Sequence, residues 1–188
     1  MQDLSLHILD IAENSIEAKA KRIEIRLEEN RRQDLLVLEV ADDGKGMDEQ
    51  MRRQALDPFV TTRKTRRVGL GLSLLAEAAR AVNGQVDIQS GEGKGTRVRA
   101  TFHLSHVDMK PLGDIAQTII TLIMGHPEID ILYTYKINTS EYRLDTQEIK
   151  AQLDGISIQT PAVITILKKD INEGLDQLRR QNEPRESL

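Results

Sequence analysis

An aspartate and an asparagine stand four residues apart in the segment HILDIAENSIEA, residues 7–18. In a helix that spacing places Asp10 and Asn14 on one face, where both side chains can act on one small object. The asparagine amide oxygen is a hard ligand suited to Mg²⁺, and the carboxylate can hold a water molecule. The pair suits a metal-bound triphosphate with an attacking water, whereas a solvated polar stripe is the simpler interpretation of the segment taken alone.

A second segment, DDGKGM (residues 42–47), places two glycines directly after an apolar run. Gly44 and Gly46 allow a tight turn and a close approach of the backbone to a ligand. The carboxylate of Asp42 is an acceptor suited to an exocyclic amine such as that of adenine. An ordinary Asp-Gly turn explains the same letters, so this segment alone does not define a site.

A third segment, VGLGLSLL (residues 68–75), places Gly69 and Gly71 where a loop enters a helix. Helix N-termini expose unpaired N–H groups and the positive end of the helix dipole, which together bind phosphate. Close helix packing is an equally good explanation of the two glycines.

Two more segments are ambiguous on their own. DPFVTTRK (residues 57–64) ends in Arg63 and Lys64, which could meet phosphates, although a run of charges is usually solvated. GEGKGT (residues 91–96) has the composition of a hairpin turn.

The elements that must position these segments follow from apolar periodicity. Helices are expected over 3–20, 48–56, 71–82, 112–125 and 145–153 and from about 160, and strands over 22–28, 35–42, 85–90, 96–104, 129–136 and 140–144. Asp3 and Asp48 are suited to cap their helices, as is Thr160 with Pro161 after it. The order predicts an α/β fold, a two-layer sandwich whose mixed, mostly antiparallel sheet carries helices on one face.

The segment SHVDMKP (residues 105–111) indicates a domain boundary. Residues 107–188 are expected to form a smaller α+β region of unknown function. Within that region IAQTIITLIM (115–124) predicts a buried helix that packs in its own region or, alternatively, at a dimer or partner interface. We also hypothesise that the strand near 129–136 joins the main sheet.

Composition excludes several classes of protein. The 188 residues are 39% hydrophobic and 30% charged, which suits a globular chain with a core. A net charge of −4 argues against nucleic-acid binding, and the absence of cysteine excludes disulfides and thiolate sites. We see no signal peptide and no apolar run long enough to span a bilayer, so we expect a cytoplasmic protein that does not associate with membranes.

Five segments in this order resemble the motifs of the GHKL ATP-binding domains, the family of DNA gyrase, the large heat-shock chaperones, histidine kinases and mismatch-repair ATPases. The resemblance covers about residues 4–104 and indicates a histidine kinase-like ATP-binding domain over 1–106. The matching segments are DIAENSIEA for the N box, DDGKGM for G1, DPFVTTRK for the F box, VGLGLSL for G2 and GEGKGTRVRATF for the closing G3 region.

The resemblance implies a Bergerat α/β sandwich that binds ATP and Mg²⁺ beneath a lid loop. By position, Asn14 would bind Mg²⁺ and Asp42 the adenine amine, while Thr96 would lie near the base. Gly44 and Gly46 would let the base approach. The phosphate contacts would come from Gly69, Leu70 and Gly71 at the helix start and from Arg63 and Lys64 in the lid.

Two positions depart from the family pattern. Arg67 stands where the G2 box usually begins with a glycine, which affects how the lid would move. Asp10 stands where hydrolysing members carry glutamate, and a general base misplaced by about 1 Å can lose on the order of a hundredfold in rate. ATP binding is therefore better supported than ATP hydrolysis.

Several functions remain open. The chain could be an ATP-dependent regulatory switch or phosphotransfer component, a serine protein kinase like the anti-sigma kinases with Asp10 as base, or a non-catalytic nucleotide-sensing module. A histidine kinase is less expected, because no phosphoacceptor helix pair precedes the N box and His7 lies inside the ATP-site helix. A protein partner is expected, and a homodimer is a candidate.

Overall fold

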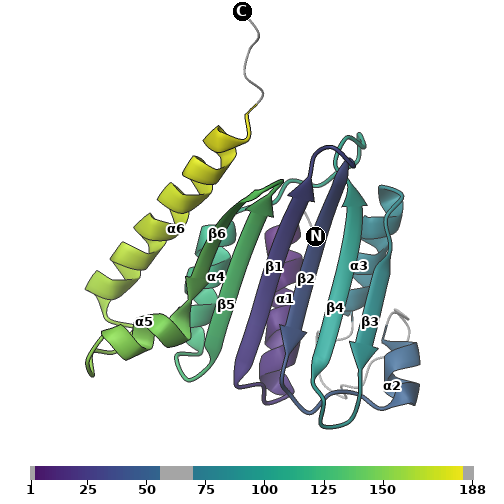
Figure 1. Cartoon of the computed structure of the whole chain (residues 1–188). Helices are drawn as coiled ribbons and strands as arrows, with labels where there is room; N and C mark the ends of the chain where they lie inside the picture. The colour runs from purple at the N-terminus through teal and green to yellow at the C-terminus, as the bar shows by residue number, and fades with distance from the viewer. Residues whose placement is uncertain (1–2, 56–69, 184–188) are drawn as a thin grey trace, which may run out of the picture.

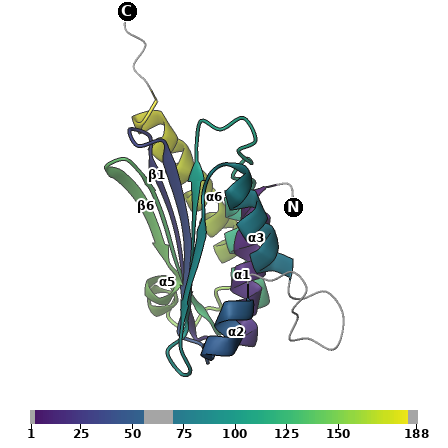
Figure 2. The same cartoon turned by 90° about the vertical axis from the view of Figure 1, so that its right-hand side faces the viewer.

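Among residues 3–55 and 70–183, which this computed structural model describes, six strands form one mixed sheet in the order β3-β4-β2-β1-β5-β6 (Figure 1). The strands are β1 Arg22–Asn30, β2 Leu35–Asp42, β3 Val86–Ser90, β4 Thr96–His103, β5 Asp130–Ile137 and β6 Ser140–Asp145. The helices are α1 Leu4–Glu17, α2 Glu49–Gln54, α3 Leu70–Ala81, α4 Ile115–Gly125, α5 Thr146–Gln152 and α6 Pro161–Gln181. Because α1, α3 and α4 lie on one face of the sheet, the expected two-layer α/β sandwich is confirmed (Figure 2).

Strand alternation decides which side chains meet the helices. In β1, Ile23, Ile25 and Leu27 are buried, while the residues between them face the side of the sheet away from α1. β2 pairs antiparallel with both β1 and β4, and the register sets Asp42 directly opposite Thr96. Two residues predicted to contact a ligand are therefore neighbours at the same end of the sheet.

The C-terminal region extends this sheet. β5 pairs in parallel with β1 over eight positions, from Arg22 opposite Asp130 to Glu29 opposite Ile137, which confirms the hypothesis that this strand joins the main sheet. α4 packs against α6 of its own region, as expected, but also against α1, so its buried face joins the region after residue 106 to the helix that carries Asn14. The boundary between 106 and 107 stays a prediction.

α6 covers the end of the sheet formed by β5 and β6. A glycine at 174 allows a close approach, because a Cβ added there would lie 2.2 Å from the ring of Tyr142. Tyr142 donates to Asp170 of α6 at 2.7 Å, and Tyr135 of β5 donates to Glu29 of β1. α6 is thus tied to the sheet by packing at Gly174 and by the Tyr142–Asp170 hydrogen bond, while the Tyr135–Glu29 bond joins the two strands β5 and β1.

The predicted helix caps have mixed outcomes. Asp3 accepts from the N–H of Leu6 at 3.2 Å, and Asp48 accepts from Met51 at 2.7 Å, so both are confirmed. Thr160 precedes α6 with Pro161 at the first position, but its side chain makes no capping hydrogen bond. The prediction was wrong on that bond, and the proline alone marks the start, since its ring fixes φ and its missing N–H needs no partner. Within the described ranges we find no helix with both the length and the apolar character needed to cross a membrane.

Candidate functional site

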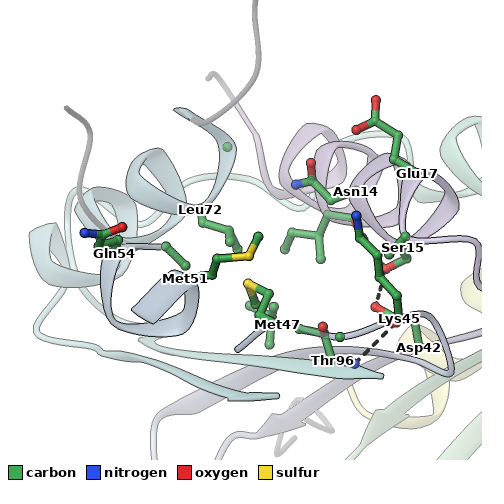
Figure 3. A pocket seen from close by; sticks show the side chains of 16 residues that line it. Asn14, Ser15, Glu17, Asp42, Lys45, Met47, Met51, Gln54, Leu72 and Thr96 are labelled. Atoms are coloured by element: carbon green, nitrogen blue, oxygen red, sulfur yellow. Dashed lines mark hydrogen bonds between the residues drawn. The ribbon is translucent and has the colours of Figure 1, made fainter. Parts of the chain in front are cut away.

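A cavity of about 390 Å³ opens between α1, the turn after β2, α2 and the start of α3 (Figure 3). It lies at the end of the sheet where β2 finishes and β4 begins. Five residues predicted from the sequence line it: Asn14, Asp42, Gly46, Gly71 and Thr96. The fold therefore brings together groups from four of the five motif segments.

Asp42 holds the most defined position in the cavity. Its Oδ1 accepts from the N–H of Gly44 at 2.9 Å and from that of Thr96 at 3.3 Å, and its Oδ2 accepts from Ser15 Oγ at 2.7 Å. An ionised carboxylate offers about four acceptor positions, so these three donors leave one for a donor from outside the chain. The side chain is fixed in place and still able to accept one more hydrogen bond.

The adjacent Asp43 has a structural role. Its Oδ1 accepts from the backbone N–H groups of Lys21 and Arg22 at 2.7 and 2.9 Å, which ties the end of β2 to the start of β1. Although burial raises it, these N–H bonds hold the pKa of the Asp43 carboxyl below its usual value. Of the two aspartates of DDGKGM, Asp42 therefore lines the cavity and Asp43 anchors the strand.

Two glycines bring the turn after β2 against the hairpin between β3 and β4. Gly46 has φ +67°, and a Cβ there would lie 2.0 Å from the carbonyl oxygen of Gly91. Gly95 has φ +73°, and a Cβ there would lie 1.9 Å from the carbonyl oxygen of Asp42. The hairpin that reads as an ordinary turn in the sequence thus packs against the turn after β2, whose residues Lys45, Gly46 and Met47 line the site.

Ser90, which sequence reasoning did not single out, joins these parts. Its Oγ accepts from the N–H of Met47 at 2.8 Å and lies 2.9 Å from the carbonyl oxygen of Gly95. It also lies 3.0 Å from Thr96 Oγ1. Only the packing of the turn at Met47 against this hairpin, 43 residues away in the sequence, reveals this role.

Gly44 takes a different part from the one that the resemblance implies. It is buried and does not line the cavity, and a Cβ there would lie 2.8 Å from the carbonyl oxygen of Ala18. Its contribution in the structure is to let the turn pack against α1 and to present an N–H to Asp42.

Asp10 lies one helical turn before Asn14 and beside the start of α3. A Cβ added to Gly71 would be 3.2 Å from Asp10 Oδ2, so the glycine lets this carboxylate approach the first turn of that helix. Desolvation by its neighbours, and then the negative charge of Glu13, raise the pKa of the Asp10 carboxyl above its usual value. A carboxyl in this state is suited to take a proton from a nucleophile.

The phosphate side of the predicted site is described only in part. Arg63, Lys64 and Gly69 lie outside the described residues, while Leu70 begins α3 and Gly71 follows in its first turn. Among residues 3–55 and 70–183, no group of three or more acidic or histidine side chains could hold a metal ion. The amide oxygen of Asn14 could supply one ligand to Mg²⁺, and phosphate oxygens and water would supply the others. This is the coordination that Mg²⁺ favours in nucleotide sites.

Several lining residues were not found from the sequence. Met47, Met51 and Leu72 give the cavity an apolar wall, and Ser15, Glu17 and Lys45 add polar groups from α1 and the turn (Figure 3). Met47 ends the DDGKGM segment, and Met51 follows it by one helical turn. That spacing was the available signal, but methionine is so often a simple core residue that it does not stand out.

Comparison with known proteins gives the family. The model for histidine kinase-, DNA gyrase B- and HSP90-like ATPases matches residues 2–106. The sensor histidine kinase YxdK of Bacillus subtilis is 40% identical over 74 residues, which cover 37% of this chain and 23% of that protein. The sensor protein kinase FleS of Pseudomonas aeruginosa is 36% identical over 110 residues, which cover 58% of this chain and 27% of that protein.

Among solved structures, the N-terminal domain of a DNA repair protein superposes with a TM-score of 0.57 at 17% identity, over 77% of this chain and 53% of that one. This likeness concerns the fold and agrees with the expected Bergerat type of sandwich. The chain spans only about a quarter of the length of the two kinases that it matches. With more than half of its residues matched by the family model, the chain belongs to the histidine kinase-, DNA gyrase B- and HSP90-like ATPases.

Proposed function

We propose that this protein binds Mg²⁺-ATP in the cavity beside Asp42 and works as a nucleotide-dependent switch. The observation that carries the proposal is the carboxylate of Asp42, which three internal donors hold in place and which keeps one acceptor position. The exocyclic amine of adenine supplies the missing donor. Guanine carries a carbonyl at the corresponding ring position, so the same carboxylate discriminates against it.

The rest of the cavity suits a purine. Its volume of about 390 Å³ falls in the range of small-molecule pockets, which is roughly 300–1,000 Å³. Met47, Met51 and Leu72 offer apolar contacts to the faces of a planar base, while Thr96 stands beside Asp42 at its polar edge. One polar end and apolar sides are the usual design of a nucleotide-base pocket.

The triphosphate would extend from the base towards Asn14 and the start of α3. We assign Asn14 as the protein ligand of Mg²⁺, and the backbone of Gly69, Leu70 and Gly71 as donors to phosphate oxygens. Arg63 and Lys64 are proposed as further phosphate contacts. Closure of the segment that contains them over bound nucleotide would change the surface seen by a protein partner.

Phosphoryl transfer to a serine is the second candidate, and the position of Asp10 favours it. Asp10 lies against Gly71, where the phosphates would end, and its raised pKa suits a general base. The shorter side chain of aspartate places the carboxylate farther from an attacking group than glutamate would. We therefore propose the nucleotide-dependent switch ahead of phosphoryl transfer to a serine.

The test is calorimetric titration with ATP and with a non-hydrolysable analogue, each with and without Mg²⁺. We expect micromolar binding of both, strengthened by Mg²⁺, and much weaker binding of GTP. A lack of binding to every nucleotide would refute the proposal. If ATP binds and is consumed at a rate above that of the Asp10→Asn variant, phosphoryl transfer or hydrolysis replaces the passive switch.

A further inference from the structure

Lys45 occupies a fixed place at the mouth of the cavity. Its backbone N–H donates to the carbonyl oxygen of Ala18 at 2.9 Å, and its own carbonyl accepts from Gly93 at 2.8 Å. Gly46 next to it cannot gain a side chain without meeting Gly91. Since the backbone is held from both sides, the direction in which the lysine side chain leaves the turn is fixed as well.

The side chain runs along α1. Figure 3 shows it rising from the level of Asp42 past Ser15, so that its ammonium group lies on the Asn14 side of the cavity. The residue is exposed. Its ammonium forms no ion pair with residues 3–55 or 70–183, although carboxylates line the same cavity.

Asp42 is not the partner of this ammonium. No ion pair joins the two side chains, and the Asp42 oxygens accept instead from Ser15, Gly44 and Thr96, with one acceptor position left over. A lysine that lines the proposed nucleotide cavity and forms no ion pair with the described residues is available to a charged ligand. Lysine binds phosphate as a mobile point charge and does not need the planar geometry that arginine requires.

We propose that Lys45 is a phosphate-contacting residue, which makes the site favour nucleotides over nucleosides. The inference rests on the proposed function, because it assumes that the base lies at Asp42. From there the phosphates pass Asn14, and the ammonium lies on the same side. The turn after β2 would then serve the base through Asp42 and the phosphates through Lys45.

The experiment compares the full chain with Lys45→Met, which keeps the length of the side chain and removes its charge, and with Lys45→Arg, which keeps the charge. Lys94→Met is the matched control. Lys94 is exposed in the neighbouring hairpin and does not line the cavity. Affinities for ATP, ADP and adenosine are measured by competition at two salt concentrations.

We expect Lys45→Met to weaken ATP and ADP binding by about five- to tenfold, as for an exposed charge-assisted bond, and to reduce the salt dependence. Adenosine binding should change by less than about twofold, as should ATP binding by Lys45→Arg and by Lys94→Met. An unchanged ATP affinity in Lys45→Met overturns the inference. So does an equal loss for adenosine, which would mean a contact to the base, or an equal loss in Lys94→Met, which would mean a general field effect. Failure of the unmodified chain to bind ATP removes the proposed function and this inference with it.

Discussion

Ser15 Oγ lies 2.7 Å from Asp42 Oδ2, although 27 positions separate the two residues in the sequence. The bond joins α1, at the residue after Asn14, to the end of β2. This hydroxyl therefore ties the proposed base end of the cavity to the proposed metal end. The Asp42 carboxylate is consequently oriented before any ligand arrives, which lowers the entropy cost of binding.

The first prediction concerns this hydroxyl. Ser15→Ala removes one of the three donors to Asp42, so we expect ATP affinity to fall by about three- to tenfold, the usual effect of one hydrogen bond to a charged group. Calorimetry measures the change. Ser157→Ala, at an exposed position outside the cavity, is the control, and equal affinity in both variants would show that Ser15 does not orient the carboxylate.

A second prediction concerns Asp42 itself. Asp42→Asn keeps the shape of the side chain but replaces one acceptor oxygen by a donor NH₂, which then faces either an internal donor or the adenine amine. We expect ATP affinity to fall by at least about tenfold. Unchanged affinity for ATP would remove the assignment of this residue to the base.

A third prediction separates the metal from the nucleotide. Asn14→Ala should abolish the strengthening of ATP binding by Mg²⁺ and leave the weaker, metal-independent binding in place, because the assigned protein ligand of the ion is lost. Titrations with and without Mg²⁺ give the ratio of the two ATP affinities for each variant. Persistence of the Mg²⁺ effect would mean that another residue holds the metal.

A fourth prediction concerns stability and pH. His7 is buried on α1, and its Nδ1 has no hydrogen-bond partner within the described structure. Desolvation by burial lowers the pKa of His7 from 6.5 to about 4. Between these two pH values the unfolded chain binds more protons at His7 than the folded chain does. The free energy of unfolding therefore rises as the pH rises through this window, and it decreases as the pH falls through it.

The difference between the two pKa values corresponds to on the order of 3 kcal/mol between pH 4 and pH 6.5. Urea unfolding at a series of pH values measures it. His7→Leu should remove most of this slope, because the leucine side chain has no proton to gain. A slope equal to that of the unmodified chain would assign the pH dependence to other groups.

A fifth prediction uses two glycines with nearly the same backbone angle. Gly46 has φ +67° and Gly93 has φ +69°, but a Cβ at 93 meets nothing within 4 Å, whereas one at 46 would lie 2.0 Å from a carbonyl oxygen. Both substitutions to alanine incur the left-handed penalty of roughly 1–2 kcal/mol. Gly46→Ala should add roughly 1–3 kcal/mol of steric cost and also weaken ATP binding. Equal melting temperatures and equal ATP affinities for Gly46→Ala and Gly93→Ala would argue against the close packing of Gly46 on the hairpin between β3 and β4.

Local patterns predicted most of the elements. The alternation of Ile23, Ile25 and Leu27 predicted the buried face of β1, and Asp3 and Asp48 marked helix starts that the structure confirms. Long-range relationships could not be predicted in the same way. The roles of Ser15 and Ser90 depend on registers between distant segments, and a single serine carries no pattern of its own.

The register between β1 and β5 has an experimental consequence for anyone who dissects this protein. A fragment that ends near residue 106 would turn β1 from an interior strand into an edge, with a row of unpaired backbone N–H and C=O groups along eight positions. Such an edge pairs with other chains. A loss of ATP binding in the fragment could therefore result from self-association as well as from the loss of a contact to residues 107–188. The contribution of residues 107–188 is better measured by single substitutions on the surface of α6, in a chain whose sheet stays complete.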